Sequence, residues 1–234
     1  MKDVVYLSGS GRTATTMWSI LLSSELGLKN LGQSRDYVRA VFNDETCSCG
    51  DPVRECYATG REIARYRNTR GKLARFAISR WFSLKHIRHE LRGEGAVVDA
   101  SKGIRHLALT MAVTQRRPVV LEFQRPEAEI SASWRGLGRS EDFIARVSRK
   151  AARRRTALDV LSRIGVIRLL SFEFRYALSH TNEVLEKVAH EIGVTFTPSG
   201  DGSVYRIAEH TQHIFPPSDP RYLTKVDEIR IRVK

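Results

Sequence analysis

Residues 4–18, VVYLSGSGRTATTMW, constrain the fold of this chain more than any other stretch. A run of β-branched and aromatic residues leads through a loop of small residues into an apolar, helix-like pattern. A strand, a glycine-rich loop and a helix in this order form the opening unit of a parallel sheet. Ligands of such sheets bind beyond the carboxyl ends of the strands, so this loop is the first place to expect one.

The same alternation of strand and helix patterns continues along the chain. Further strands are expected at residues 28–34, 95–101, 118–123 and 165–174. Helices are expected at residues 13–27, 126–137, 140–164 and 181–193, with long basic helices over 61–92 and one more helix that ends near Met111. The pattern predicts one α/β domain over residues 1–234, with a central parallel sheet flanked by helices.

Local signals refine these boundaries. Gly27 should end the first helix, and Thr181 or Asn182 should cap the last one. Residues 34–60 read as irregular, because they hold all the cysteines and a turn at Asp51-Pro52. The tail from Thr195 is rich in proline, glycine and serine, which predicts loops with short extended pieces.

The charge balance predicts an anionic partner. The chain has 39 lysines and arginines against 26 acidic residues, a formal net charge of +13. A nucleotide, a nucleic acid, an acidic glycan or a membrane surface would each fit. We expect a soluble, cytoplasmic protein, because the N-terminus leads straight into a strand and no segment approaches the ~18 apolar residues of a membrane span.

Two common glycine-loop motifs fit residues 8–16 poorly. Gly9, Gly11 and Ala14 satisfy the dinucleotide pattern G-x-G-x-x-G/A, but the expected acidic residue after the second strand is missing. Gly9 and Thr16 fit the two ends of a Walker P-loop, G-x-x-x-x-G-K-[ST]. Thr15 stands where that motif has its lysine, which argues against a magnesium-dependent ATPase or kinase.

A third interpretation keeps the anion cradle of backbone N–H groups and moves the cation to Arg12. Threonine hydroxyls would add donors. This loop resembles the 5′-phosphosulfate loop of the P-loop-like sulfotransferase family that uses 3′-phosphoadenosine 5′-phosphosulfate (PAPS), in its bacterial type. The resemblance implies that the cofactor is bound by Gly9, Ser10, Gly11, Arg12, Thr13, Ala14, Thr15 and Thr16. Gly11 replaces the usual proline of the family pattern, and Ala14 replaces the usual glycine.

A second segment resembles the 3′-phosphate motif of the same family. In FQRPEAEISASW, Arg125 ends a strand and Ser133 follows eight residues later on the next helix. The family usually places its proline two residues after the arginine, whereas Pro126 follows directly here. A looser C-terminal match adds Arg221 to the implied cofactor-binding residues.

The resemblance also implies a mechanism. An acceptor hydroxyl or amine attacks the sulfur of PAPS, adenosine 3′,5′-bisphosphate (PAP) departs, and no metal is required. Arg12 and Lys102, the latter in VVDASKG, would stabilise the transferred group. Bacterial members of the family often have a glutamate base after the second strand, where this chain has Gln33. Asp36 is the first candidate to replace that base, and Asp99 is the second. Each also has a structural alternative, a helix-dipole acid for Asp36 and a loop-orienting carboxylate for Asp99.

The three cysteines, Cys47, Cys49 and Cys56, lie within ten residues of one another. An odd, clustered set is not a disulfide framework, and it fits a reducing compartment. The spacing C-x-C-x6-C leaves zinc open, but no histidine lies nearby, so structural thiols or one disulfide are favoured and no metal is assigned.

The acceptor and its pocket carry no readable motif. Residues 34–92 and 136–160 should form the acceptor site and its lid, with a small molecule, a glycan or a secondary metabolite as the acceptor. Two alternatives remain: a nucleotide-dependent small-molecule kinase, and a basic nucleic-acid-binding protein supported by the run SRKAARRRT at 148–156. That run lacks interleaved aromatics and any recognised nucleic-acid-binding motif, so no nucleic-acid partner is expected.

Overall fold

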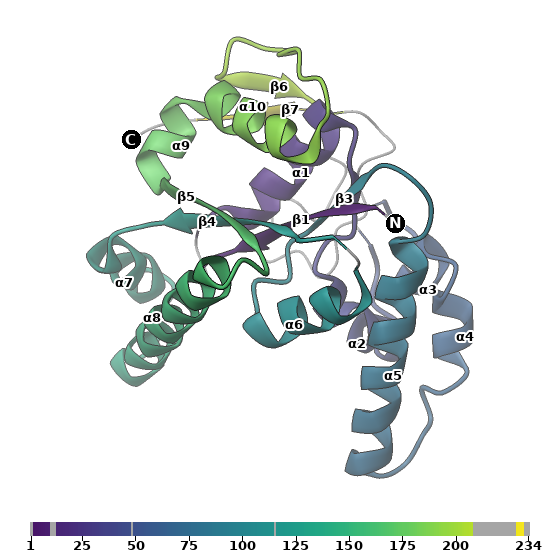
Figure 1. Ribbon diagram of the computed structural model, residues 1–234. Coiled ribbons are helices and arrows are strands. Elements are labelled where there is room, and N and C mark those ends of the chain that lie inside the picture. The colour runs from purple at the N-terminus through teal and green to yellow at the C-terminus, as the bar shows by residue number, and fades with distance from the viewer. Residues whose placement is uncertain (1, 10–12, 48, 115, 208–227, 232–234) are drawn as a thin grey trace.

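The computed structural model describes residues 2–9, 13–47, 49–114, 116–207 and 228–231. They form a single α/β domain around a five-stranded sheet (Figure 1), as the sequence predicts. Its strands are β1 (Asp3–Ser8), β2 (Lys29–Asn30), β3 (Ala96–Asp99), β4 (Val119–Gln124) and β5 (Arg168–Glu173). They are all parallel and stand in the order β2-β3-β1-β4-β5. A small antiparallel pair, β6 (Val204–Arg206) and β7 (Glu228–Arg230), lies apart from this sheet.

Helices cover both faces of the sheet (Figure 1). One face carries α1 (Thr15–Leu26), α9 (Phe174–Ser179) and α10 (Thr181–Ile192). The chain also forms α2 (Ser34–Phe42), α3 (Val53–Cys56), α4 (Gly60–Ala64), α5 (Lys72–Glu90), α6 (Ile104–Val113), α7 (Glu127–Arg135) and α8 (Glu141–Arg163), on the other side or at its edge.

The pleat of the strands divides the core in two. In β1, Val5 and Leu7 belong to the cluster beneath α1 and α10, whereas Val4 and Tyr6 belong to the cluster on the opposite face. All four are nearly inaccessible to solvent. A strand that is apolar on both faces is typical of a parallel sheet with two helical layers, which is why the run at residues 4–7 read so clearly.

The structure corrects three local predictions. Residues 34–60 are not irregular throughout, because α2 begins at Ser34 and buries Tyr37, Val38 and Val41 on one face. The last strand of the sheet ends at Glu173, one residue early, since the Glu173 carboxylate accepts backbone hydrogen bonds at the start of α9.

The third correction concerns the cap of α10. His180, and neither Thr181 nor Asn182, occupies the position before the helix. The Thr181 hydroxyl instead donates to the carbonyl oxygens of Ala177 and Leu178, so this residue already lies within the helical turn.

The strand order brings three loops together. β1 lies between β3 and β4, although β3 and β4 follow it in the chain. The segments that follow Ser8, Asp99 and Gln124 therefore leave the same edge of the sheet on adjacent strands. Such a reversal of strand order is where open α/β sheets bind ligands.

Candidate functional site

Gly9, directly after β1, cannot carry a side chain. A Cβ there would lie 2.3 Å from the Thr13 hydroxyl oxygen and 3.2 Å from the Thr15 methyl carbon. Thr13 and Thr15 therefore lie directly against Gly9. Residues 10–12, and with them Ser10, Gly11 and Arg12 of the expected cradle, lie outside the described part of the chain.

The helix that follows begins in a strained way. Ala14, at the N-cap of α1, has φ 51° and ψ 25°, the left-handed region that favours glycine. It provides no side-chain capping hydrogen bond, and the first turn contains no acidic residue. The positive end of the α1 dipole thus lies at this edge, beside the buried Thr15 and Thr16. No acidic side chain in the first turn of α1 offsets it.

The second junction holds Arg125 in a defined position. Its Nε donates to Glu129 Oε2 at 3.0 Å, and its guanidinium carbon lies 5.0 Å from the centre of the Phe174 ring. Pro126 caps α7, and Ser133 is half-buried near the other end of that helix. Arg125 and Ser133 are therefore on one strand-to-helix unit next to the β1 loop.

Asp99, at the end of β3, is the centre of a buried hydrogen-bond network. Its carboxylate accepts hydrogen bonds from the hydroxyl groups of Ser34 and Ser101 and from the Ser101 amide, and it lies 3.2 Å from His106 Nε2. Burial alone would raise the pKa of Asp99, but His106 and the two serines lower it below its usual value. A carboxylate satisfied on both oxygens and 1% exposed orients the loop well and is poorly placed to take a proton from a substrate.

Lys102 lies three residues after the β3 end, in a left-handed conformation with φ 62°. Burial, together with the charges of Arg35 and Arg154, lowers the pKa of Lys102 to about 8, and Asp36 opposes this shift. The Tyr6 hydroxyl donates to the next carbonyl, that of Gly103, at 2.9 Å. Lys102 is thus a poorly solvated cation held at the same edge as the β1 loop.

Asp36 lies across from it in the first turn of α2. It forms ion pairs with Arg35, at 2.8 Å between Nη2 and Oδ2, and with Arg39, at 3.6 Å between Nη2 and Oδ1. Its side chain is only 14% exposed. The structure therefore brings Asp36 into electrostatic range of Lys102, while two arginines hold its carboxylate charge in place.

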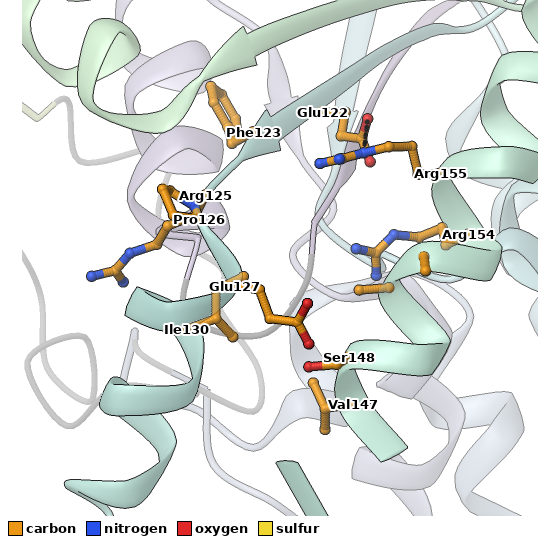
Figure 2. A pocket seen from close by; sticks show the side chains of 12 residues that line it. Glu122, Phe123, Arg125, Pro126, Glu127, Ile130, Val147, Ser148, Arg154 and Arg155 are labelled. Atoms are coloured by element: carbon orange, nitrogen blue, oxygen red, sulfur yellow. Dashed lines mark ion pairs between the residues drawn. The ribbon is translucent and has the colours of Figure 1, made fainter. Parts of the chain in front are cut away.

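A cavity of about 250 Å³ opens between the end of β4, α7 and α8 (Figure 2). Glu122 and Arg125 line it from the strand end, and Arg154 and Arg155 line it from α8. Glu122 is 2% exposed, and its Oε2 lies 3.7 Å from Arg155 Nε. Burial lowers the pKa of Arg154, and its buried Nε has no hydrogen-bond partner among the described residues. The wall of this cavity thus holds a cation with unsatisfied donor capacity.

Arg125 and the region 136–160 were predicted from the sequence, but Glu122, Arg154 and Arg155 were not singled out as residues of this cavity. Glu122 interrupts an otherwise apolar strand, PVVLEF, and such a residue is a signal for a buried polar site. Arg154 was part of the run at 148–156 and could not be told from its solvated neighbours without knowing which face of α8 packs. Arg221, expected to bind cofactor, lies outside the described residues.

The remaining candidates lie away from this edge. Cys47 and Cys49 lie between α2 and α3, Cys56 ends α3, and their three sulfur atoms form one cluster. No helix of the described residues is both long and apolar enough to cross a membrane.

Comparison with solved structures identifies the fold. No protein-family profile and no curated protein sequence matches the chain. The sulfotransferase domain of the curacin biosynthetic pathway superposes with a TM-score of 0.54 at 14% identity, over 92% of this chain and 84% of that one. The sulfotransferase domain of the Synechococcus PCC 7002 olefin synthase gives a TM-score of 0.55 at 15% identity, over 97% and 84%. A putative kinase from Chloroflexus aurantiacus gives a TM-score of 0.45 at 12% identity, over 82% and 96%. The chain therefore has the P-loop NTPase-like fold of sulfotransferase domains, and at these identities the likeness establishes the fold alone.

Proposed function

We propose that this protein is a PAPS-dependent sulfotransferase that transfers a sulfuryl group to a hydroxyl or amine of a small-molecule, carbohydrate or secondary-metabolite acceptor. The observation that carries the proposal is the strand order. Three motifs that are about 90 and 25 residues apart in the sequence follow β1, β3 and β4, which are neighbours in the sheet. Chance glycine loops or strand-end arginines have no reason to share one edge of one sheet.

The cofactor would lie across the β1 and β4 junctions. The 5′-phosphosulfate would be bound by backbone N–H groups of the β1 loop and by the hydroxyls of Thr13, Thr15 and Thr16, with Arg12 as the cation. Arg125, with Ser133 and Arg221, would bind the 3′-phosphate, because an arginine offers several donors to a dianion. Two observations fit a bound anion at this loop. A Cβ at Gly9 would collide with Thr13, and α1 begins without a side-chain cap or an acidic residue in its first turn.

Lys102 is our candidate for the charge that stabilises the transition state. PAPS would supply an activated sulfuryl group. Negative charge grows on the bridging oxygen of the leaving PAP as its bond to sulfur breaks. A sulfuryl group carries less charge than a phosphoryl group, so fixed side-chain cations suffice and no catalytic metal is needed. Each of Arg12 and Lys102 would lower the barrier by ~2–4 kcal/mol, as comparable oxyanion donors do.

We assign different roles to the two carboxylates. Asp36 lies within electrostatic range of Lys102 and is the candidate general base for a hydroxyl acceptor. Asp99 acts as a positioning residue, since its contacts with Ser34 and His106 tie the start of α2 and the start of α6 to the end of β3. Asp99 would thus fix the positions of Asp36, on α2, and of Lys102, in the loop before α6.

The α8 side of the cavity beside β4 is the candidate acceptor site, since Arg125 on its β4 side is assigned to the 3′-phosphate, and this agrees with the expected acceptor region at residues 136–160. The unsatisfied Arg154 favours an acceptor that carries an anionic or strongly hydrogen-bonding group. The wall formed by residues 34–92 would complete the site on the β3 side. We expect no nucleic-acid partner, because the basic run on α8 faces this cavity in part and is not a continuous outer surface.

Turnover with a mixed acceptor panel tests the proposal. PAP release from PAPS is followed in the presence of a chelator, beside ADP release from ATP with magnesium. We expect PAP release that depends on an acceptor and resists chelation. ADP release that depends on magnesium, with no PAP release, would replace this proposal by the kinase alternative.

A further inference from the structure

The three cysteines of the chain converge on one point between the end of α2 and the end of α3. The sulfur atoms of Cys47, Cys49 and Cys56 all lie within 4.8 Å of one another, and those of Cys49 and Cys56 are 3.7 Å apart. None of the three is in a disulfide bond. The chain has no other cysteine, so its entire thiol content is gathered in one cluster.

Backbone hydrogen bonds join the described residues on the two sides of the cluster. Thr46 and Pro52 form an antiparallel bridge, the Cys47 amide donates to the Asp51 carbonyl at 2.8 Å, and the Gly50 amide donates to the Cys47 carbonyl at 3.0 Å. Gly50 has φ 95°, which lets the chain reverse between the second cysteine and Asp51. The short helix α3 then returns Cys56 to the first two thiols.

We propose that Cys47, Cys49 and Cys56 bind a structural zinc ion, with the carboxylate of Asp51 as the fourth ligand. Four-coordinate zinc with Zn–S bonds of about 2.3 Å places its sulfurs about 3.8 Å apart. The 3.7 Å between Cys49 and Cys56 matches this edge, and the remaining sulfur distances need only a small closure. Asp51 Oδ2 lies 3.9 Å from Cys49 Sγ but is not part of the close group that the three sulfurs form, so the Asp51 side chain must turn toward them to complete the site.

Zinc accounts for features that a disulfide leaves unexplained. A disulfide would join two of the sulfurs and leave the third beside them without a role. Thiolate-rich sites select zinc among the common divalent ions, and a site whose four positions are all protein ligands is structural. Cys47 is 3% exposed and Cys56 half-buried, so part of the site is shielded from water.

The site would brace the wall of the expected acceptor region. Tyr57, the residue after Cys56, donates its hydroxyl hydrogen to the Asn30 carbonyl of β2 at 3.0 Å. A metal at the cluster thus fixes the segment that lies against the edge strand of the sheet. This role does not depend on the proposed sulfuryl transfer.

Metal analysis of the full chain tests the site. The protein is purified under reducing conditions without a metal-affinity column, and zinc is measured by mass spectrometry. We expect about one zinc per chain, and loss of that zinc in C47S, C49S and C56S. Asp51→Asn should weaken zinc binding at least about tenfold, whereas the neighbouring Glu45→Gln, whose carboxylate accepts from Asn43, should not.

Cobalt gives a readout that does not depend on the variants folding. Cobalt added to the chelator-treated wild-type chain should produce thiolate-to-cobalt charge transfer and the visible bands of a tetrahedral site. Because the chain has no other thiols, such a spectrum can come only from these three residues. Absence of both zinc and the cobalt spectrum, or alkylation that finds one free thiol and one disulfide, would overturn the proposal.

Discussion

The cofactor side and the acceptor side of this molecule are built in opposite ways. Around the β1 and β4 junctions, backbone turns and a few residues close in sequence create the site, such as Gly9 with Thr13 and Thr15. Around the cavity and Lys102, side chains from β4, α2 and α8 meet across more than a hundred residues of sequence. A phosphate-binding loop is formed by residues close in sequence, so it can be recognised as a motif. An acceptor pocket is formed by side chains from distant segments, so no sequence motif marks it.

Lys102 sits where the two sides meet, and its loss should give the largest effect. We expect Lys102→Met to lower kcat about 10³-fold with little change in the affinity for PAP, since the charge acts mainly on the transition state. Lys102→Arg should retain much of the activity. An equal loss of kcat and PAP affinity in Lys102→Met would assign Lys102 to the cofactor side alone.

The same residue predicts a pH dependence. Because the pKa of Lys102 is about 8 and the ammonium form is the active one, kcat/KM for PAPS should fall as pH rises through about 8. In Lys102→Arg, the fall of kcat/KM should move to higher pH, because the guanidinium stays protonated. A fall at the same pH in that variant would show that another group titrates.

The two carboxylates should separate chemistry from architecture. Asp36→Asn should lower kcat for a hydroxyl acceptor about 10²-fold and leave the free energy of unfolding nearly unchanged. Asp99→Asn should lower the free energy of unfolding by about 2 kcal/mol, because an amide cannot accept all the hydrogen bonds that the buried carboxylate accepts from Ser34 and Ser101. Urea unfolding and turnover, measured on both variants, check this; loss of turnover without loss of stability in Asp99→Asn would reverse the assignment.

Arg154 tests the acceptor side by itself. We expect Arg154→Gln to raise KM for the acceptor about tenfold and to leave KM for PAPS unchanged, because it removes one charged donor from the cavity. Arg153→Gln, an exposed arginine on the same helix, is the matched control. Steady-state kinetics with both substrates varied would contradict this prediction if the two variants behaved alike.

Ala14 gives the smallest effect and concerns the backbone of the cofactor side. Replacing it with glycine should raise the free energy of unfolding by about 0.5–1 kcal/mol, because the left-handed conformation favours glycine. Ala132→Gly, in the exposed face of α7, should lower it by a similar amount. Thermal and urea unfolding of the two variants measure the difference, and the same sign for both would deny the strain at Ala14.

The comparison also explains what the sequence could and could not predict. Both strand-to-helix junctions were readable because a buried strand followed by a small-residue loop leaves few alternatives. Helix α2 was missed because the cysteines and the turn at Asp51-Pro52 outweighed the apolar spacing of Tyr37, Val38 and Val41. The partners of Glu122 and the convergence of the thiols depend on tertiary packing, which no local pattern encodes.

In the proposed sulfotransferase, the β4 junction recognises the 3′-phosphate of the cofactor. Isothermal titration with PAP, AMP and ATP with magnesium, on wild type, Arg125→Ala and the exposed control Arg135→Ala, tests it most directly. PAP should bind at least about 100-fold more tightly than AMP, and Arg125→Ala alone should remove that difference. Equal binding of the three nucleotides, or a preference for PAP that survives in Arg125→Ala, would contradict the claim.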